Sequence, residues 1–231
     1  MIKINDKEKI NKYIEKYEIL EFLNKDLSDY MELFLFRRGE YICKKGENLK
    51  YLYFFVQGKS KVLASLSNGK LLLICFYNKF ELIGDLEFVN CKNIDTSIKV
   101  IEDSYCIAIP VNEARQYLLA NNKFLKYMCG SLGKKLENLS QNSSINLLYP
   151  LKNRLCSYII ATSIIKKTDQ GNIQIFNENL TETSELLGAS YRHLLRTLNN
   201  LVSDGAIAKE EKYYKIVNET LLTKLASDVY K

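Results

Sequence analysis

One stretch of this 231-residue chain decides how its C-terminal part folds: Thr181-Glu182-Thr183-Ser184-Glu185-Leu186-Leu187-Gly188-Ala189-Ser190-Tyr191-Arg192-His193-Leu194-Leu195-Arg196-Thr197-Leu198. Two helical patterns in it are joined by a three-residue turn centred on Gly188-Ala189. Gly188 suits the end of the first helix, because the backbone there needs a positive φ, and Ser190 is a good N-cap for the second. Leucines at helical spacing supply a small shared core: Leu186, Leu187, Leu194, Leu195, Leu198 and Leu201. This spacing predicts a helix-turn-helix, a motif whose second helix lies in the major groove of DNA.

The start of the second helix carries side chains that could read DNA. If Ser190 caps this helix, Tyr191, Arg192 and Arg196 fall near its start and along one exposed side. An arginine at such a position can donate two hydrogen bonds to guanine. His193 lies on the same helix, either as a phosphate contact or simply as an exposed residue. The pattern therefore predicts a recognition helix, with Arg192 and Arg196 as the base-contacting residues.

A wing is predicted directly after the helix. Asp204-Gly205 turns the chain into two short strands, Ala206–Ala208 and Lys212–Val217. Three lysines of this segment could meet phosphate: Lys209, Lys212 and Lys215. By spacing alone one alternative stays open, in which the chain is a non-catalytic ligand-binding or interaction module whose helical hairpin contacts protein. Salt dependence distinguishes the two, because duplex binding through several phosphates weakens steeply as salt rises.

The N-terminal part of the chain has a different period. Residues 6–30 show helical spacing, and short apolar runs bounded by turn residues follow: Met31–Phe36, Tyr51–Val56, Lys61–Leu66, Leu71–Tyr77 and Ser104–Ile109. Asn68-Gly69 between two of these runs is a strong hairpin signal, since both residues tolerate positive φ. Runs of this length and spacing predict an antiparallel β-roll.

Helical period returns after Pro110. A short helix over 111–120 is followed by a long one from Asn122, with an apolar seam at three- and four-residue spacing: Leu125, Met128, Leu132, Leu136 and Leu139. A narrow seam on a helix about 37 Å long usually needs a partner, so it packs either on a second copy of the chain or on its own β-domain. Pro150 is well placed as the first residue of the next helix, Leu151–Thr162.

The predicted fold class is therefore α+β, in three parts. Residues 1–110 form the β-roll with its N-terminal helix, residues 111–149 the two connecting helices, and residues 150–231 the winged helix-turn-helix.

Composition narrows the function further. Residues 1–110 hold 17 basic against 16 acidic residues, and residues 111–231 hold 16 against 11, so the positive excess lies where a phosphate-binding surface would need it. No apolar run has the ~20 residues needed to span a bilayer, and the N-terminus lacks a signal peptide, so we expect a cytoplasmic protein without a membrane partner. With His193 as the single histidine, cupin-like metal enzymes and most metal sites are not expected, and the sequence predicts no catalytic residues.

Several of these segments together resemble the Crp/Fnr family of transcription regulators, most closely its YeiL-like branch. The resemblance covers nearly the whole chain. It rests on Ser190-Tyr191-Arg192-His193-Leu194-Leu195 followed by Asp204-Gly205, on the sensor-domain signature Leu82-Ile83-Gly84-Asp85-Leu86-Glu87, and on the glycines of the roll corners, Gly39, Gly46 and Gly58. It implies a jelly roll of the cyclic-nucleotide-binding type, a homodimer joined along the long helices, a two-fold symmetric operator in double-stranded DNA, and RNA polymerase as a partner. The family commonly has an acidic residue at the Arg192 position, so the preferred half-site here is expected to differ.

The resemblance also points to an effector pocket, with a departure. Its candidate residues are Gly84, Asp85, Thr96 and Ser97. Members that bind cyclic nucleotides pair the Gly-Glu of the signature with an Arg-Ser a dozen residues later; the arginine neutralises the phosphate, and the acidic residue bonds the ribose hydroxyl. Here the later segment reads Asp95-Thr96-Ser97, without an arginine and with an extra carboxylate. Lys99 could take the place of the missing arginine only if the alternation of its strand directs its side chain into the pocket. A phosphate facing Asp95 is disfavoured by charge repulsion and desolvation, so we expect no tight binding of cyclic AMP.

The positions of the cysteines and of the single histidine bear on two other cofactors that members of the family use to sense signals. An oxygen-labile iron–sulfur cluster needs a cysteine group near the N-terminus, whereas the first cysteine is Cys43. Histidine-ligated haem is not expected in the sensor domain, because His193 lies outside it. A small organic effector stays open, as does a thiol signal through Cys43, Cys75, Cys91 or Cys106, and no cofactor is identified.

Overall fold

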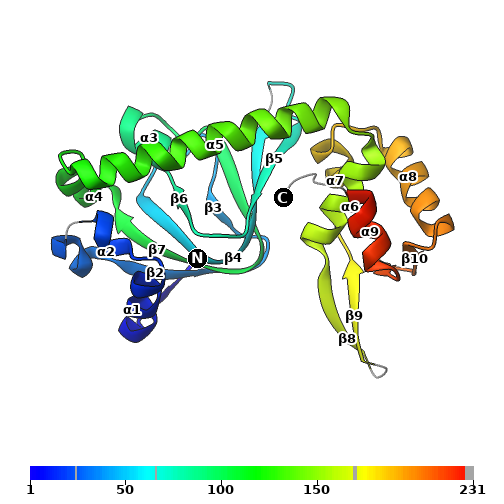
Figure 1. Cartoon of the computed structure of the whole chain (residues 1–231), viewed down its shortest axis with the longest axis horizontal. Helices are drawn as coiled ribbons and strands as arrows, with labels where there is room; N and C mark the ends of the chain where they lie inside the picture. The colour runs from blue at the N-terminus through cyan, green and yellow to red at the C-terminus, as the bar shows by residue number, and fades with distance from the viewer. Residues whose placement is uncertain (24, 66, 169–170, 227–231) are drawn as a thin grey trace. The chain divides into compact units, whose positions relative to one another are not determined.

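A computed structural model describes residues 1–23, 25–65, 67–168 and 171–226, and in it the chain forms two compact units (Figure 1). Unit 1 comprises Met1–Ala64 and Ile74–Leu139, and unit 2 comprises Ser65–Leu73 and Ser140–Lys231. The predicted division has a third part, residues 111–149, between the β-roll and the winged helix-turn-helix. This division stays a prediction.

The predicted β-roll is present as a sheet of seven strands among the described residues. The strands are β1 (Ile2–Ile4), β2 (Glu32–Phe36), β3 (Tyr41–Cys43), β4 (Tyr51–Ser65), β5 (Leu71–Tyr77), β6 (Glu81–Ile83) and β7 (Thr96–Pro110). Their order is β1-β2-β7-β4-β5, while β3 pairs with β7 and β6 with β4. Gly69 has φ +80° in the predicted Asn68-Gly69 hairpin between β4 and β5.

The strand boundaries correct the prediction at one place in particular. The runs Tyr51–Val56 and Lys61–Leu66 belong to one strand, β4, which passes through register shifts between Phe55 and Ser60 against β7; Leu66 lies outside the described residues. Bulges explain the misreading, because an inserted residue interrupts the apolar alternation without ending the strand. The three-residue strands β1, β3 and β6 were not predicted, because none of them corresponds to one of the apolar runs in the sequence.

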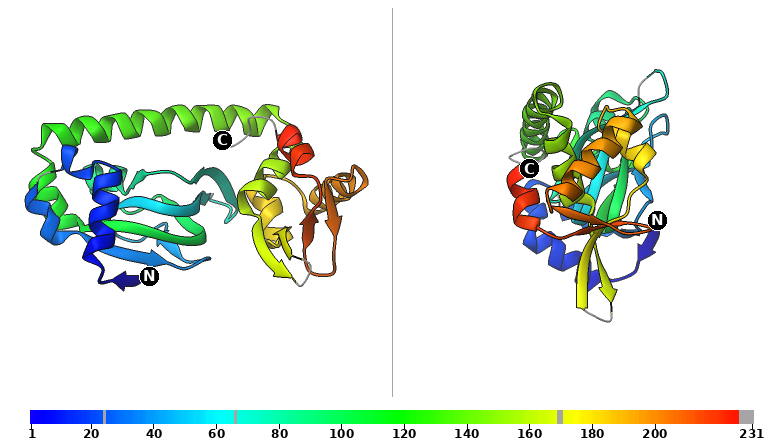
Figure 2. Two further views of the ribbon diagram at one scale, coloured as in Figure 1. Left: turned by 60° about the horizontal axis from the view of Figure 1, so that its bottom comes forward. Right: turned by 90° about the vertical axis from the view of Figure 1, so that its right-hand side faces the viewer.

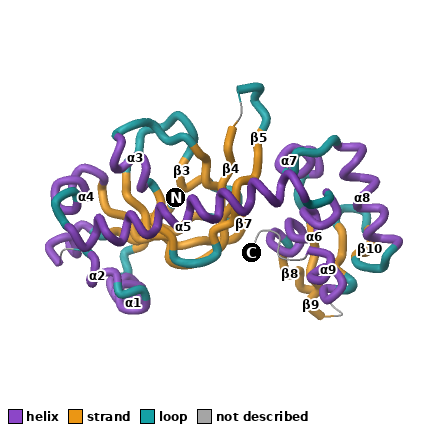
Figure 3. Tube along the Cα trace, turned by 45° about the horizontal axis from the view of Figure 1, so that its top comes forward, coloured by secondary structure: helices purple, strands orange, loops and turns teal. Residues whose placement is uncertain are grey.

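Helices of unit 1 cover the roll. They are α1 (Lys7–Lys16), α2 (Ile19–Phe22), a 3₁₀ helix (Lys25–Tyr30), α3 (Asp85–Asn90), α4 (Val111–Leu118) and the part of α5 (Asn122–Leu148) that ends at Leu139. The helical pattern over 6–30 is not one helix, because the chain breaks at Glu18, whose φ is +51°. Figure 2 shows α5 as a single uninterrupted helix, and Figure 3 shows its first part running along the strands of the roll.

The core of unit 1 joins strands and helices through aromatic side chains. Phe36, Phe54, Phe55, Phe88 and Phe124 are almost fully buried. The rings of Phe88 on α3 and Phe124 on α5 meet edge to face at 5.7 Å. Burying a phenylalanine contributes roughly 1.5–3 kcal/mol, so α3 and the start of α5 are firmly attached to the roll.

The predicted seam of α5 divides between two environments. Met128 lies in the core of unit 1, and Leu125 and Leu132 pack against that core. Leu136 and Leu139, in contrast, are 68% and 43% exposed. The alternative in which the helix packs on its own β-domain therefore describes the first part of the seam, and self-pairing stays a prediction for the rest.

Unit 2 contains the predicted helix-turn-helix and two hairpins. Its elements are α6 (Leu151–Thr162), β8 (Ile164–Thr168), β9 (Gly171–Phe176), α7 (Leu180–Leu186), α8 (Tyr191–Ser203), β10 (Ile207–Lys209), β11 (Tyr214–Ile216) and α9 (Glu219–Ala226). The strand order is β10-β11-β9-β8. The hairpin β8–β9 was missed by the sequence analysis, and Pro150 caps α6 from the position before its first residue rather than starting it. Nowhere in the described residues is a helix both long and apolar enough to cross a membrane.

Candidate DNA-binding and effector sites

Local hydrogen bonds fix the start of each helix of the helix-turn-helix. Asn179 caps α7 by accepting a hydrogen bond from the Glu182 backbone N–H at 3.0 Å, and Ser190 caps α8 by accepting one from His193 N–H at 3.2 Å. Gly188 between them has φ +60°, the left-handed conformation that glycine adopts without strain. The Arg154 guanidinium of α6 donates to the Leu187 carbonyl at 2.5 Å. The turn is therefore held by its own caps and by the preceding helix.

The small core beneath α8 agrees with the sequence at all but one position. Leu186, Leu187, Leu194, Leu198 and Leu201 are buried to within 1% exposure. Leu195 is only half-buried, and Thr197 is buried in addition, with its hydroxyl donating to the His193 carbonyl at 2.9 Å. The apolar face of α8 is thus rotated slightly from the predicted one, since Thr197 can hide its hydroxyl in the helix while packing its methyl group.

The opposite face of α8 is exposed and basic. Tyr191, Arg192, His193 and Arg196 are all exposed, and the first turn of the helix holds no acidic residue. Among the described residues, neither guanidinium has a hydrogen-bond or ion-pair partner. The positive end of the helix dipole lies at the same place. This surface can therefore meet a polyanion without first breaking an interaction.

The strands and turns of unit 2 carry further lysines. Lys209 and Lys212 are exposed, and Lys215 is half-buried. The missed hairpin β8–β9 adds exposed Lys166 and Lys167, and the Lys166 ammonium lies 4.4 Å from the centroid of the Tyr213 ring. The alternating run Ile173-Gln174-Ile175-Phe176 is the signal that could have revealed β9.

The signature segment of unit 1 forms the turn from β6 into α3. Gly84 has φ +90°, a backbone conformation that favours glycine, and a Cβ atom there would lie 2.6 Å from Leu49 Cδ1, so the Leu49 side chain would have to shift. Asp85 follows as the first residue of α3, and its carboxylate is 6% exposed. Lys135 of α5 supplies its counter-ion, with Nζ 2.7 Å from Asp85 Oδ2.

Lys135 is a functional candidate that the sequence analysis did not identify. Its ammonium also donates to the Leu82 carbonyl and lies 5.6 Å from the centroid of the Tyr77 ring. The side chain is 20% exposed. Its partner lies 50 residues away in the sequence, so no local pattern could have revealed it. The acidic group that the resemblance assigns to a ligand's ribose is therefore neutralised from within the chain.

The second half of the predicted effector pocket is also engaged internally. Ser97 is buried, and its hydroxyl accepts a hydrogen bond from the Lys45 backbone N–H at 3.0 Å, while Thr96 is half-buried at the start of β7. Lys99 lies on the same strand, and its ammonium is 5.7 Å from the centroid of the Tyr41 ring. The expectation that Gly84, Asp85, Thr96 and Ser97 form an effector pocket thus stays a prediction.

Three of the six cysteines, Cys43, Cys106 and Cys156, are buried, and Cys75 is half-buried. Burial raises the pKa of the Cys43, Cys75 and Cys156 thiols to about 12, and raises the pKa of the fully buried Cys106 as well. Cys91 and Cys129 are exposed. Among the described residues, no cluster of three metal-ligating side chains is present.

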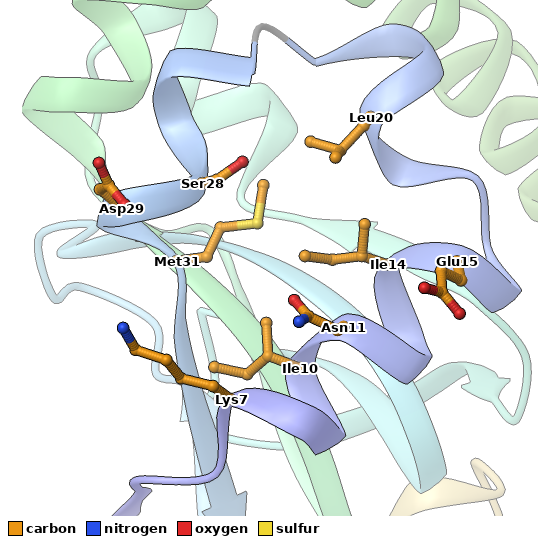
Figure 4. Close-up of a pocket in the computed structure, with 9 residues that line it drawn as sticks. All are labelled: Lys7, Ile10, Asn11, Ile14, Glu15, Leu20, Ser28, Asp29 and Met31. Atoms are coloured by element: carbon orange, nitrogen blue, oxygen red, sulfur yellow. The ribbon is translucent and has the colours of Figure 1, made fainter.

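Unit 1 also has a concavity beside its N-terminal helices, shown in Figure 4. Its volume is about 360 Å³. Apolar side chains of Ile10, Ile14, Leu20 and Met31 line it, and its polar lining mixes signs: Lys7, Asn11, Glu15, Ser28 and Asp29. With one cation and two carboxylates around an apolar floor, its charges select no class of ligand.

Comparison with known proteins gives the family. Residues 33–121 match the cyclic nucleotide-binding domain. The chain is 32% identical over 208 residues to the regulatory protein YeiL of Escherichia coli O157:H7, covering 88% of this chain and 90% of that protein. It is 24% identical to an anaerobic regulatory protein of Bacillus subtilis, covering 83% of each.

Solved structures show the same fold at low identity. A protein assigned to the Crp/Fnr family from Eubacterium rectale superposes with a TM-score of 0.75 at 13% identity, covering 93% of this chain and 99% of that one. A CRP-family transcriptional regulator from Thermus thermophilus gives a TM-score of 0.66 at 15% identity, covering 86% and 98%. The predicted α+β fold and the resemblance are both confirmed, and the chain belongs to the Crp/Fnr family of transcription regulators.

Proposed function

We propose that this regulator acts as a homodimer in the cytoplasm, where it binds a two-fold symmetric operator in double-stranded DNA and works with RNA polymerase. One α8 occupies the major groove of each half-site, with Arg192 and Arg196 at base edges. Tyr191 lies beside them at a position that contacts bases in the family, and Ser190, His193, Lys209 and Lys212 contact the DNA backbone. The observation that carries this proposal is the exposed basic face of α8, whose two guanidiniums have no partner among the described residues.

The dimer would form along the exposed part of α5. Leu136 and Leu147 lie eleven residues apart, which is three helical turns, and they are 68% and 84% exposed. Leu139 flanks them at 43% exposure. Large apolar side chains in water on one helix face usually mark an interface, and a second copy of the same helix is the partner that a two-fold symmetric operator requires.

The sensor domain would respond to something other than cyclic AMP. Lys135 Nζ lies 2.7 Å from Asp85 Oδ2, so a ribose hydroxyl would have to compete with Lys135 for the Asp85 carboxylate. The Asp95 carboxylate would in addition repel the cyclic phosphate. Calorimetric titration is expected to show no saturable binding at micromolar concentration, and such binding would contradict this part of the proposal. No catalytic role is assigned to any residue.

The test is selection from a random DNA duplex pool by the purified, ligand-free chain at moderate salt, read by sequencing. We expect enrichment of a two-fold symmetric motif whose half-sites lie about one helical turn apart. Affinity for the enriched duplex should fall steeply with salt, because several phosphate contacts release counterions. A chain that enriches no motif, alone or with metabolites from a cell extract, would instead be the protein-interaction module that the spacing left open.

A further inference from the structure

A second concavity of unit 1 lies between the N-terminal helices and α5. We call it the α2–α5 groove, and it is lined by Glu21, Phe22, Phe80, Glu81, Lys123, Lys126, Tyr127, Gly130, Ser131 and Lys134. Its volume is about 640 Å³, which lies within the range of small-molecule sites. These residues come from α2, the turn before β6, β6 itself and the first part of α5. None of them belongs to the signature segment or to the predicted effector pocket.

The floor of the groove is aromatic. The rings of Phe22 and Tyr127 stack at 3.9 Å with an interplanar angle of 4°, and Phe80 lies 6.5 Å from Tyr127. Phe80 is itself stacked on Tyr17 at 4.5 Å. Each ring is thus held by another ring, so the floor is pre-formed. Flat, rigid aromatic surfaces of this kind favour a planar ligand through offset or edge-to-face contact.

The rim of the groove is mainly basic. Lys123, Lys126 and Lys134 are exposed, and no described carboxylate lies within ion-pair distance of them. Two carboxylates also line the groove: Glu21, which is exposed, and Glu81, which is half-buried. Burial raises the pKa of Glu81, opposed in part by Lys135 and Lys134. Three cations against two carboxylates leave a positive rim.

Gly130 forms part of the wall. A Cβ atom added there would meet nothing within 4 Å, so packing inside the chain does not require glycine. Glycine within a helix costs roughly 0.8–1 kcal/mol relative to alanine. Its presence in the wall keeps the groove open where a larger side chain would narrow it.

The groove uses a face of α5 that the proposed dimer leaves free. By the 3.6-residue period, Lys123, Tyr127, Gly130 and Lys134 share one face of the helix. Phe124 and Met128 point into the core, and Leu136 with Leu147 defines a third face. A ligand in the groove would therefore contact the dimer helix without displacing a partner copy.

We propose that the α2–α5 groove binds a small planar aromatic anion, an aromatic carboxylate or phosphate, as the effector of this regulator. The ring would lie against Phe22, Phe80 and Tyr127, and the anionic group would be held by Lys126 and Lys134. The binding site is argued from the groove alone, whereas the role of its ligand as an effector rests on the proposed function. Because one wall of the site is α5, occupancy would be communicated directly to the helix that joins the dimer.

Binding is measured on the full chain without DNA, using the fluorescent aromatic sulfonate 8-anilinonaphthalene-1-sulfonate and its uncharged counterpart N-phenyl-1-naphthylamine. We expect saturable binding of the sulfonate, and binding of the neutral amine at least tenfold weaker. Competition by 2-naphthoate and by 2-naphthyl phosphate distinguishes a carboxylate from a phosphate ligand.

Matched variants locate the dye. The double variant Lys126→Ala/Lys134→Ala should weaken sulfonate binding at least tenfold, whereas Lys44→Ala/Lys92→Ala, which removes two exposed lysines elsewhere in unit 1, should not change it. Gly130→Leu should abolish binding by filling the groove, and Gly130→Ala should retain it, with circular dichroism confirming that both fold. Equal binding by all variants, or no preference for the anion, would overturn the proposal. Because no DNA is present, this result is independent of whether the duplex selection succeeds.

Discussion

Helix α8 of the helix-turn-helix and helix α3 of the signature segment both follow a glycine with positive φ, and they differ in what neutralises their charged groups. On α8, Arg192 and Arg196 are exposed and have no partner among the described residues. On α3, Asp85 is buried and lies 2.7 Å from Lys135. Both segments resemble their counterparts in the family, yet only α8 keeps its charges available to a ligand from outside. A motif shows where a site could be, and the partners of its charged groups decide whether that site is available.

The largest effect is expected at the paired site. Lys135→Ala leaves the Asp85 carboxylate, 6% exposed, without its counter-ion. Removing one partner of a buried ion pair typically costs 3–5 kcal/mol, and because Lys135 is itself 20% exposed we expect a loss of about 2–3 kcal/mol. Urea-induced unfolding measures it.

The control for this variant removes both charges. Asp85→Asn/Lys135→Met should recover more than half of the lost stability, since no buried charge remains unpaired. If the free energy of unfolding of Lys135→Ala lies within about 0.5 kcal/mol of that of the unchanged protein, Lys135 does not stabilise the Asp85 carboxylate. The contrast with α8 would then disappear.

A smaller effect is expected at the unpaired site, and on binding rather than on folding. Arg196→Ala should lower affinity for the selected duplex by about 1–3 kcal/mol and relax the preference at one base position. Stability should change little, because the exposed guanidinium has no hydrogen-bond or ion-pair partner in the described part of the chain. Fluorescence anisotropy at fixed salt measures the affinity.

The matched control is Lys224→Ala, which removes an exposed cation of α9 in the same unit. It should weaken binding to all duplexes slightly and leave the base preference intact. An Arg196→Ala protein with unchanged affinity and preference would mean that α8 does not dock as proposed.

Local signals account for what the sequence predicted well. Gly188 and Ser190 fix the start of α8 through backbone conformation and a cap within three residues. The bounds of α6 and the start of α5 at Asn122 likewise follow from helical period and the position of Pro150. Such features depend on neighbours along the chain, so one sequence is enough to read them.

Features that depend on distant partners were read incompletely. The period of α5 identified its apolar residues but not the surfaces that cover them, and Met128 is buried while Leu136 is exposed. The pairing of Lys135 with Asp85 joins elements 50 residues apart. The α2–α5 groove likewise depends on where α2 meets α5, which no local pattern encodes.

The smallest expected effect is a difference in thiol reactivity between the cysteines whose pKa is raised by burial and the two exposed cysteines. With the pKa of Cys43, Cys75 and Cys156 raised to about 12 by burial, these groups hold almost no thiolate at pH 8, and thiolate is the reactive form. We expect Cys91 and Cys129, which are exposed, to account for all rapid reaction of the folded protein with Ellman's reagent. The variant Cys91→Ser/Cys129→Ser should then react only on unfolding, with stability changed by no more than about 0.5 kcal/mol. Rapid reaction of that variant would show that a thiol in the roll reaches solvent, and a thiol signal through Cys43, Cys75 or Cys106 would become the better account of the sensor domain.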